Sequence, residues 1–278
     1  MKLRGLRGSR NIEDRRRSNG GGGAKIGGVG LLLVLAVGYF AGIDVTPLLQ
    51  QGLPQDQTSA GPLTAEEERA AEFTSRVLGT TEQVWGQVFP DQLGRPYEPP
   101  VLVLFSGQTS SPCGGASGAT GPFYCPADEK AYLDTEFFAT LSQNLGARGD
   151  FAAAYVIAHE VAHHVQNEVG ILGEVNRMRQ QVSKVEANAL TVRLELQADC
   201  LSGVWARNVS GLLEPGDLEE ALNAARKIGD DHLQRRAGRF PQPHTFTHGT
   251  SEQRSRWFAR GYELGDMNAC DTFRARQL

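Results

Sequence analysis

The sequence predicts an α+β fold that is mostly helical and has a small sheet. Three short runs of β-branched and aromatic residues lie between positions 101 and 133, and long segments with helical spacing of apolar residues follow them. A few strands followed by many helices are typical of α+β domains rather than of doubly wound sheets. No internal repeat is visible in the 278 residues.

The N-terminal segment predicts an appendage to this domain. Residues 1–25 contain eight Lys or Arg against two Asp or Glu, and a run of glycines at 20–23 follows, so we expect a disordered basic tail. Residues 26–43 contain no charged side chain and are long enough to cross a hydrocarbon core about 30 Å thick. We therefore predict one transmembrane helix at 26–43 that anchors the protein in membrane lipid.

The basic residues before this apolar run predict its orientation. They favour a cytoplasmic N-terminus, which places the remaining chain outside the cytoplasm of a single-pass plasma-membrane protein. A cleaved signal peptide is an alternative, but the run is long and no A-x-A site follows it. A buried core helix is a second alternative, which the neighbouring glycines disfavour. Residues 44–62 have linker composition, so we expect the extracytoplasmic domain to span 63–278.

Capping patterns and apolar spacing define the elements of that domain. Thr64 with Glu67 predicts a helix at 65–78, and a short helix at 81–88 follows. Strands are expected at 101–105, 123–125 and 130–133. Helices are expected at 151–169, at 171–208 with a break near Ser183, after Asp217 through the segment 228–231, and from Thr250 to 262.

The helix predicted at 151–169 contains the H-E-x-x-H motif, formed by His159, Glu160 and His163. Residues four apart lie on one face of a helix, so both imidazoles can bind one ion while the adjacent glutamate reaches a water molecule on it. Two packed core histidines are the alternative, but that arrangement leaves the carboxylate charged and unpaired in apolar surroundings. The motif therefore predicts a catalytic zinc site.

A catalytic zinc site requires a third protein ligand and one open position. Glu195 is the best candidate, because it lies on the next long helix with Asp199 one turn later on the same face. We expect Glu195 to coordinate Zn²⁺ and Asp199 to accept the free ring N–H of a ligand histidine. His164 points to another side of its helix, so we do not expect it to be a ligand.

The four cysteines favour two disulfides, because their number is even and the predicted location is oxidising. Cys113 and Cys125 flank a glycine-rich segment, which leaves Cys200 to pair with Cys270. Three pairings are formally possible, and packed free thiols are a further alternative.

With these motifs in place, the chain resembles the neutral zinc metallopeptidase family of bacteria, whose members have one N-terminal membrane anchor. The matching segments run from end to end: the basic tail from Asn11, then FYCPADEKAYLD, HEVAHHVQ, ELQAD, IGDD and FTHGTSEQR. The resemblance implies a zincin-like fold of the gluzincin type, with Glu195 as third ligand and Asp199 supporting a histidine. It also implies that the strand around Ala131 to Leu133 is the edge along which a peptide binds as an added strand.

A C-terminal element adds two candidate catalytic residues. His248 and Arg254 resemble the T-H-P-x-x-x-x-R element of membrane gluzincins, except that Gly249 stands in place of the proline. Either side chain could stabilise the oxyanion or hold a backbone carbonyl. The alternative is that the histidine packs beside a helix cap and the arginine pairs with a carboxylate.

The function expected from the sequence is a membrane-anchored zinc endopeptidase. Its polypeptide substrate would be hydrolysed by a zinc-activated water, with Glu160 as general base. The alternative is a catalytically silent, membrane-tethered zinc protein that binds or scaffolds polypeptides, and the intact Glu160 argues against it. Binding of nucleic acid by the basic tail is disfavoured, because the domain that follows is acidic and the tail precedes a predicted membrane anchor.

Overall fold

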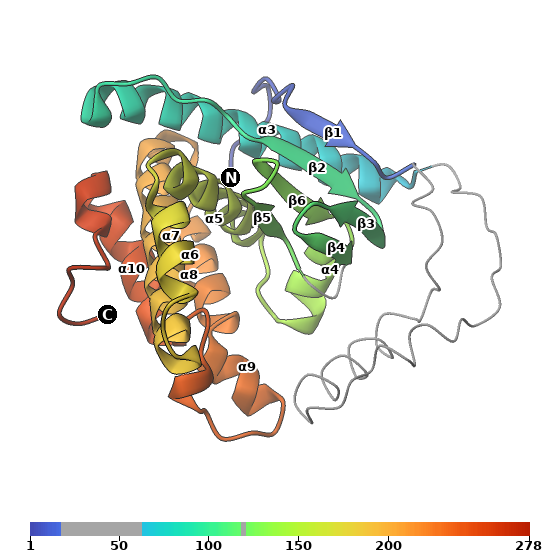
Figure 1. The fold of residues 1–278 in the computed structure, drawn as a ribbon. Helices are drawn as coiled ribbons and strands as arrows, with labels where there is room; N and C mark the ends of the chain where they lie inside the picture. Colours follow the sequence, from blue (N-terminus) through green and yellow to red (C-terminus); the bar gives the residue numbers. More distant parts are fainter. Residues whose placement is uncertain (18–62, 118–120) are drawn as a thin grey trace.

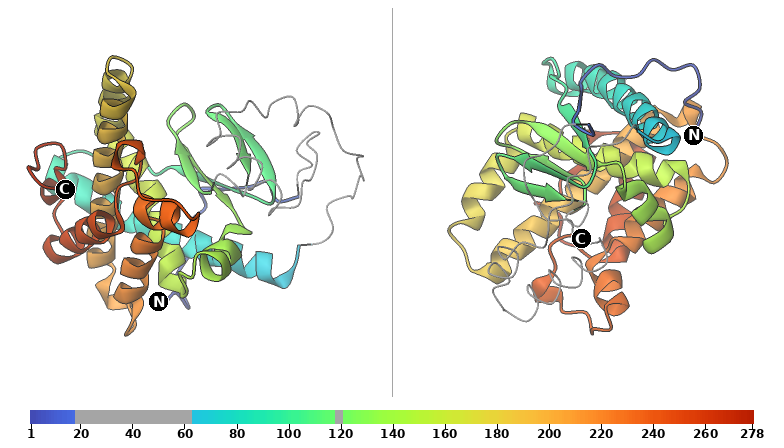
Figure 2. Two further views of the ribbon diagram at one scale, coloured as in Figure 1. Left: turned by 90° about the horizontal axis from the view of Figure 1, so that it is seen from below. Right: turned by 90° about the vertical axis from the view of Figure 1, so that its right-hand side faces the viewer.

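The computed structural model describes residues 1–17, 63–117 and 121–278 and shows a helical bundle with a small sheet at one side of it (Figures 1 and 2). The predicted α+β class is therefore confirmed. Four strands form the main sheet, in the order β1 (Ile12–Asp14), β2 (Val101–Phe105), β6 (Lys130–Asp134) and β5 (Phe123–Cys125). β1, β2 and β6 are parallel, and β5 is antiparallel to β6.

The sheet corrects one expectation about the substrate edge. The strand around Ala131 to Leu133 is β6, which is paired on both sides and is therefore not an edge. β1 and β5 are the two edge strands of this sheet. A separate hairpin pairs β3 with β4 (Gln108–Ser111 and Gly114–Ser117), which the sequence analysis did not predict.

Most predicted helices are present with altered boundaries. The helices of the described chain are α3 (Ala65–Val88), α4 (Phe137–Ala139), α5 (Asp150–Glu168), α6 (Ile171–Arg179), α7 (Lys184–Asn208), α8 (Asp217–Lys227), α9 (Asp230–Arg236) and α10 (Ser251–Leu264). Capping boxes begin α3 at Thr64 and α10 at Thr250, as predicted. A third capping box begins α7 at Ser183, where the sequence predicted only a break. Asp217 does not cap α8, because Gly216 is the N-cap and makes no side-chain hydrogen bond. Short π-helical and 3-10 turns complete the described chain: Phe89–Leu93, Thr140–Asn144, Ser210–Leu212, Pro243–Thr245 and Met267–Cys270.

Two helix predictions are wrong. The helices expected at 65–78 and 81–88 are the single helix α3, which runs through Gly79. This glycine does not end the helix. A Cβ at Gly79 would lie 3.0 Å from the carbonyl oxygen of Arg7, so the residue permits close approach of the N-terminal segment. The helix expected to continue through 228–231 ends at Lys227, and α9 begins at Asp230.

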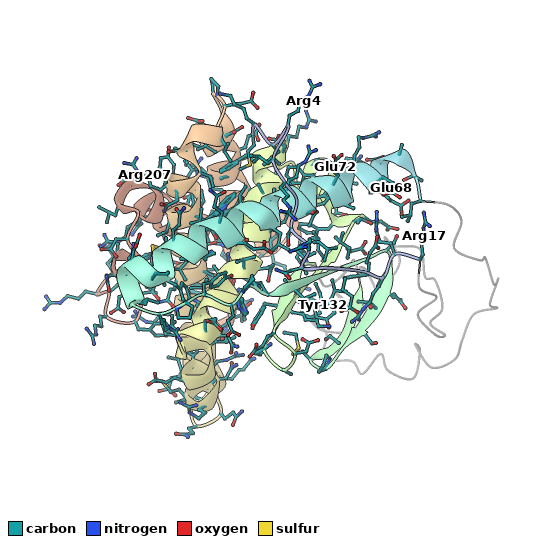
Figure 3. The ribbon with its side chains drawn as sticks, turned by 90° about the horizontal axis from the view of Figure 1, so that it is seen from above. Arg4, Arg17, Glu68, Glu72, Tyr132 and Arg207 are labelled. Atoms are coloured by element: carbon teal, nitrogen blue, oxygen red, sulfur yellow. A yellow bond between two sulfur atoms is a disulfide. The ribbon has the colours of Figure 1, made fainter. Side chains whose placement is uncertain are left out.

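The N-terminal segment is part of the folded domain, which contradicts the predicted disorder of residues 1–25 as far as residue 17. Leu3 is buried in the core, and β1 pairs with β2 through Ile12 and Leu102. Arg16 is buried, lies 2.6 Å from Asp14 and donates to the carbonyl oxygen of Glu67 on α3. Figure 3 shows the segment running along α3, with Arg17 beside Glu68.

The predicted membrane helix at 26–43 and the linker at 44–62 lie outside the described residues. Among the residues that the structure does describe, no helix is long and apolar enough to cross a membrane.

Close helix packing behind the site depends on two glycines. A Cβ at Gly203 on α7 would lie 2.1 Å from the carbonyl oxygen of Phe258, and one at Gly261 on α10 would meet Cys200. The backbones of α7 and α10 are therefore in contact at this crossing. A side chain at either glycine would force the two helices apart. The Cys200–Cys270 disulfide lies at the same crossing, and Cys113 pairs with Cys125, so both predicted disulfides are present.

The core joins the three longest helices. Phe151 on α5 stacks on Trp205 of α7, with ring centroids 5.6 Å apart. The indole N–H of Trp205 donates to the hydroxyl of Thr80 on α3. These contacts fix α5 against α7, the two helices that contain the candidate metal ligands.

Candidate metal centre

The structure brings His159, His163 and Glu195 together, as the sequence predicted. Nε2 of His159 lies 3.1 Å from one carboxylate oxygen of Glu195, and Nε2 of His163 lies 3.5 Å from the other. Together they form a group whose donor atoms all lie within 4.8 Å of one another. Ligand atoms about 2.1 Å from a tetrahedral zinc ion are separated by roughly 3.4 Å, so these three residues fit zinc.

The environment keeps Glu195 in the form that a metal ligand needs. Burial alone would raise the pKa of Glu195, but the nearby imidazoles of His163, His248 and His159 outweigh it and hold this pKa well below its usual range. The carboxylate is therefore ionised at neutral pH and can bind a cation.

Each ligand histidine is oriented by a hydrogen bond at its other ring nitrogen. Nδ1 of His159 lies 2.9 Å from Asp199, as predicted. Nδ1 of His163 lies 2.8 Å from the amide oxygen of Gln166, whose NH₂ group donates to the carbonyl oxygen of Leu194 on α7. Both contacts direct Nε2 toward the site and fix the tautomer. The sequence analysis missed Gln166, although its position one turn after His163 on α5 could have indicated it.

Asp199 is the centre of a buried network behind His159. Its side chain is fully buried and accepts hydrogen bonds from Tyr155 at 2.5 Å and from Arg254 at 2.8 and 2.9 Å. Burial raises the pKa of this carboxyl, but the guanidinium of Arg254 and the ring of His159 more than offset it, so Asp199 is ionised. The sequence analysis missed Tyr155, which lies one turn before His159.

Of the two roles expected for Arg254, its contacts fit the second, in which the guanidinium pairs with a carboxylate. The side chain is 3% exposed and its Nε and one Nη bind Asp199. The guanidinium thus acts on the site through Asp199 and His159. This arrangement assigns it a positioning contact rather than a direct one with a reacting carbonyl.

His248 has a different position. Its side chain is half exposed and lines the same cavity as the three ligands and Glu160. One carboxylate oxygen of Asp230 accepts the backbone N–H groups of Thr247, His248 and Gly249, at 2.7, 2.6 and 3.0 Å. Asp230 therefore holds the loop that presents His248 to the cavity. Burial opposes protonation of this imidazole, but Glu195 and Asp230 raise its pKa overall.

Glu160 lies beside the ligands without a hydrogen bond to any described residue, and it is 9% exposed. Burial raises the pKa of its carboxyl, an effect that His163 and His159 partly offset. A buried carboxylate without a protein donor is costly unless it has another partner. A general base whose partner is a water molecule in the cavity has this arrangement.

His164 is not brought to the site. Its Nδ1 lies 3.0 Å from the hydroxyl of Tyr124 and its Nε2 lies 2.7 Å from the carbonyl oxygen of Glu98. Both ring nitrogens are therefore used within the fold, as expected for a histidine that is not a ligand.

A cavity of about 470 Å³ surrounds the candidate ligands. Part of its lining comes from β5 and its flanks, through Pro122, Phe123, Tyr124 and Pro126, and residues of α6 and α7 line another part. The site is therefore lined by an edge strand as well as by helices.

Comparison with known proteins shows the family of this chain. Residues 1–273 match the model of a family described as "Putative neutral zinc metallopeptidase". The chain is 47% identical over 284 aligned positions to "Uncharacterized protein YpfJ" of Escherichia coli K12, covering 98% of this chain and 99% of that protein. It is 44% identical over 219 positions to "Uncharacterized protein Rv2575" of Mycobacterium tuberculosis H37Rv, covering 73% and 71% respectively. No solved structure is significantly similar to the chain.

Proposed function

The chain belongs to the neutral zinc metallopeptidase family, and from this membership we propose that it is a zinc-dependent endopeptidase with a zincin-like site of the gluzincin type. The observation that best supports the proposal is the convergence of His159, His163 and Glu195 on one point, with Glu160 in the same cavity. His159, His163 and Glu195 would hold the ion. When bound, zinc would supply Lewis-acid polarisation of the scissile carbonyl and acidification of the attacking water.

The protein groups would then transfer protons and hold the peptide. Glu160 takes a proton from the attacking water and delivers it to the leaving amine. Glu195 is the other carboxylate that lines the cavity in the described chain, and it would hold the ion. Asp199 lies behind His159 and is enclosed by its own donors. His248, presented by the loop that Asp230 holds, could donate to the developing oxyanion.

β5 is the edge at which a peptide substrate would bind. It forms a wall of the cavity, and among the described strands it pairs only with β6, so its outer edge offers backbone donors and acceptors. An extended peptide added there would recognise the strand through main-chain hydrogen bonds, which places little restriction on sequence. This assignment replaces the interior strand β6, which the sequence analysis expected in this role.

The experiment that tests the proposed activity compares peptide hydrolysis by the zinc-loaded protein with hydrolysis by the same protein carrying Glu160→Gln.

The two disulfides support a location of the domain outside the cytoplasm, because such bonds persist in oxidising compartments. Residues 1–17 would then lie on the same side of the membrane as the rest of the domain, since β1 is hydrogen-bonded to β2. A bilayer cannot separate two paired strands, so we propose that both segments lie on one side of any membrane, in place of the predicted cytoplasmic N-terminus with an exterior domain. If residues 26–43 attach the protein to lipid, residues 1–17 and residues 63–278 would have to remain on the same side of the bilayer.

Labelling of single added cysteines would check this topology. Arg4 and Arg207 are both exposed and lie on the two segments in question (Figure 3). We expect Arg4→Cys and Arg207→Cys to react to the same extent with a membrane-impermeant maleimide in intact spheroplasts. Labelling at position 207 alone, with position 4 reacting only after lysis, would restore the single-pass arrangement.

A further inference from the structure

Arg179, near the end of α6, is a cation in the wall of the candidate active site that the catalytic scheme does not use. It lines the same cavity as His159, Glu160, His163 and Glu195. Two arginines line this cavity within the described chain, and they differ in their partners. Arg254 is paired with Asp199, whereas no carboxylate lies within 4.0 Å of Arg179 in the described residues.

The hydrogen bonds of Arg179 leave part of its guanidinium unsatisfied. Nη1 donates to the side-chain oxygen of Asn176 at 3.2 Å, which is a neutral acceptor. Nε is shielded from solvent and donates to no described residue. Buried polar groups nearly always have a partner, and a guanidinium presents its N–H groups in a fork that matches the two oxygens of a carboxylate.

The surroundings of Arg179 favour an anion that arrives with an extended chain. Apolar side chains of Leu172 and Leu194 line the cavity between α6 and α7 and lower the local polarity. Beyond Arg179 a second depression of about 600 Å³ continues along α6 and the start of α7, and Lys184 is its other charged residue. The acidic residues that line the cavity are Glu160 and Glu195, both at the metal centre. The α6 end of the site is therefore cationic.

We propose that Arg179 is a specificity-determining residue that binds a carboxylate of the peptide substrate. The inference rests on the proposed peptidase function and adds a substrate class to it: peptides with an acidic group at the position that reaches α6. The carboxylate can be an Asp or Glu side chain or the C-terminal carboxylate of the peptide. Both sources have the chemistry that the guanidinium recognises, and the test separates them.

The test measures binding apart from turnover. Short fluorescent peptides would be titrated against zinc-loaded protein carrying Glu160→Gln, and affinity would be read from fluorescence anisotropy. In one series a single Glu moves through the peptide, and each peptide is compared with its Gln counterpart. In a second series, each peptide is made with a free and with an amidated C-terminus. We expect one position of Glu, or the free C-terminus, to improve affinity about 10- to 100-fold.

Variants of α6 assign that preference to Arg179. Arg179→Gln should abolish the discrimination between the Glu and Gln peptides, and Arg179→Glu should reverse it in favour of a Lys peptide. Arg177→Gln is the matched control, because Arg177 is exposed on the same helical turn and does not line the cavity. A helix-stabilising role would affect both variants similarly through the helix dipole, whereas a binding role affects only Arg179.

The outcomes also separate this inference from the proposed function. If the wild-type protein fails to hydrolyse any peptide, while the Glu160→Gln protein still prefers acidic peptides through Arg179, the peptidase proposal fails and the binding assignment stands. Equal affinity for the Glu and Gln peptides, or for the free and amidated ones, in every position would overturn the assignment. So would a preference that survives Arg179→Gln, or the absence of peptide binding altogether.

Discussion

Replacement of Glu160 by glutamine is expected to lower kcat for peptide hydrolysis by at least about 10²- to 10⁴-fold, because the amide cannot accept the proton of the attacking water. Zinc content should stay unchanged, since Glu160 is not among the three residues whose donor atoms converge. The fold should also be retained, because the carboxylate accepts no hydrogen bond from the described residues. Removal of a buried charge should leave the melting temperature of the metal-free protein equal or higher.

Glu168→Gln is the matched control for this variant. It removes the same charge from the same helix, two turns later, at a residue that does not line the cavity. We expect its activity to match that of the wild-type protein. If Glu160→Gln and the control were equally active, the catalytically silent binding protein would become the better interpretation.

Loss of Arg254 is expected to have the largest effect on stability. Arg254→Met removes the cation that neutralises Asp199, and both side chains are almost completely buried. Leaving one charge of such a pair without its partner costs about 3–5 kcal/mol. Because Asp199 also orients His159, we expect zinc affinity to fall about 10- to 100-fold. Denaturant unfolding of the metal-free protein and competition with a zinc chelator would measure the two effects separately.

Arg256→Met provides the comparison, since Arg256 lies on the same helix and pairs with the exposed Glu252. Surface pairs of this kind contribute no more than about 1 kcal/mol, and zinc affinity should not change. Equal destabilisation by both variants would show that the Arg254–Asp199 pair has no special weight. Unchanged zinc affinity in Arg254→Met would contradict its role in positioning His159.

The metal centre could be predicted because its residues follow local rules. Helical periodicity alone places His159 and His163 on one face of α5, and the same spacing aligns Glu195 with Asp199 on α7. The capping boxes at Thr64 and Thr250 are likewise encoded within four residues. These features do not require knowledge of distant contacts, so the sequence is sufficient for them.

The N-terminal strand could not be predicted, because it depends on partners far along the chain. β1 pairs with β2, Glu13 forms an ion pair with Lys130, and Arg16 lies 3.7 Å from Glu68. Without these partners, the same residues have the composition of a disordered basic tail. The break expected between residues 78 and 81 is absent for a related reason, because Gly79 admits the backbone of this segment without ending the helix.

The functions of Arg254 and Arg179 also depend on tertiary contacts. The sequence offered a direct or a structural role for Arg254, and only the α7–α10 crossing shows that it binds Asp199. Nothing in the sequence near Arg179 distinguishes it from Arg177, since the difference lies in which side chain turns toward the cavity.

Anomalous diffraction at the zinc absorption edge, from crystals of the protein grown with zinc, tests the central claim most directly. We predict one strong peak per chain, about 2.0–2.2 Å from Nε2 of His159, Nε2 of His163 and an oxygen of Glu195. A second group of possible ligands, Asp150, Asp217 and Glu220, lies at the start of α5 and α8 and serves as an internal comparison. A peak at that group with none between the two histidines and Glu195 would contradict the account.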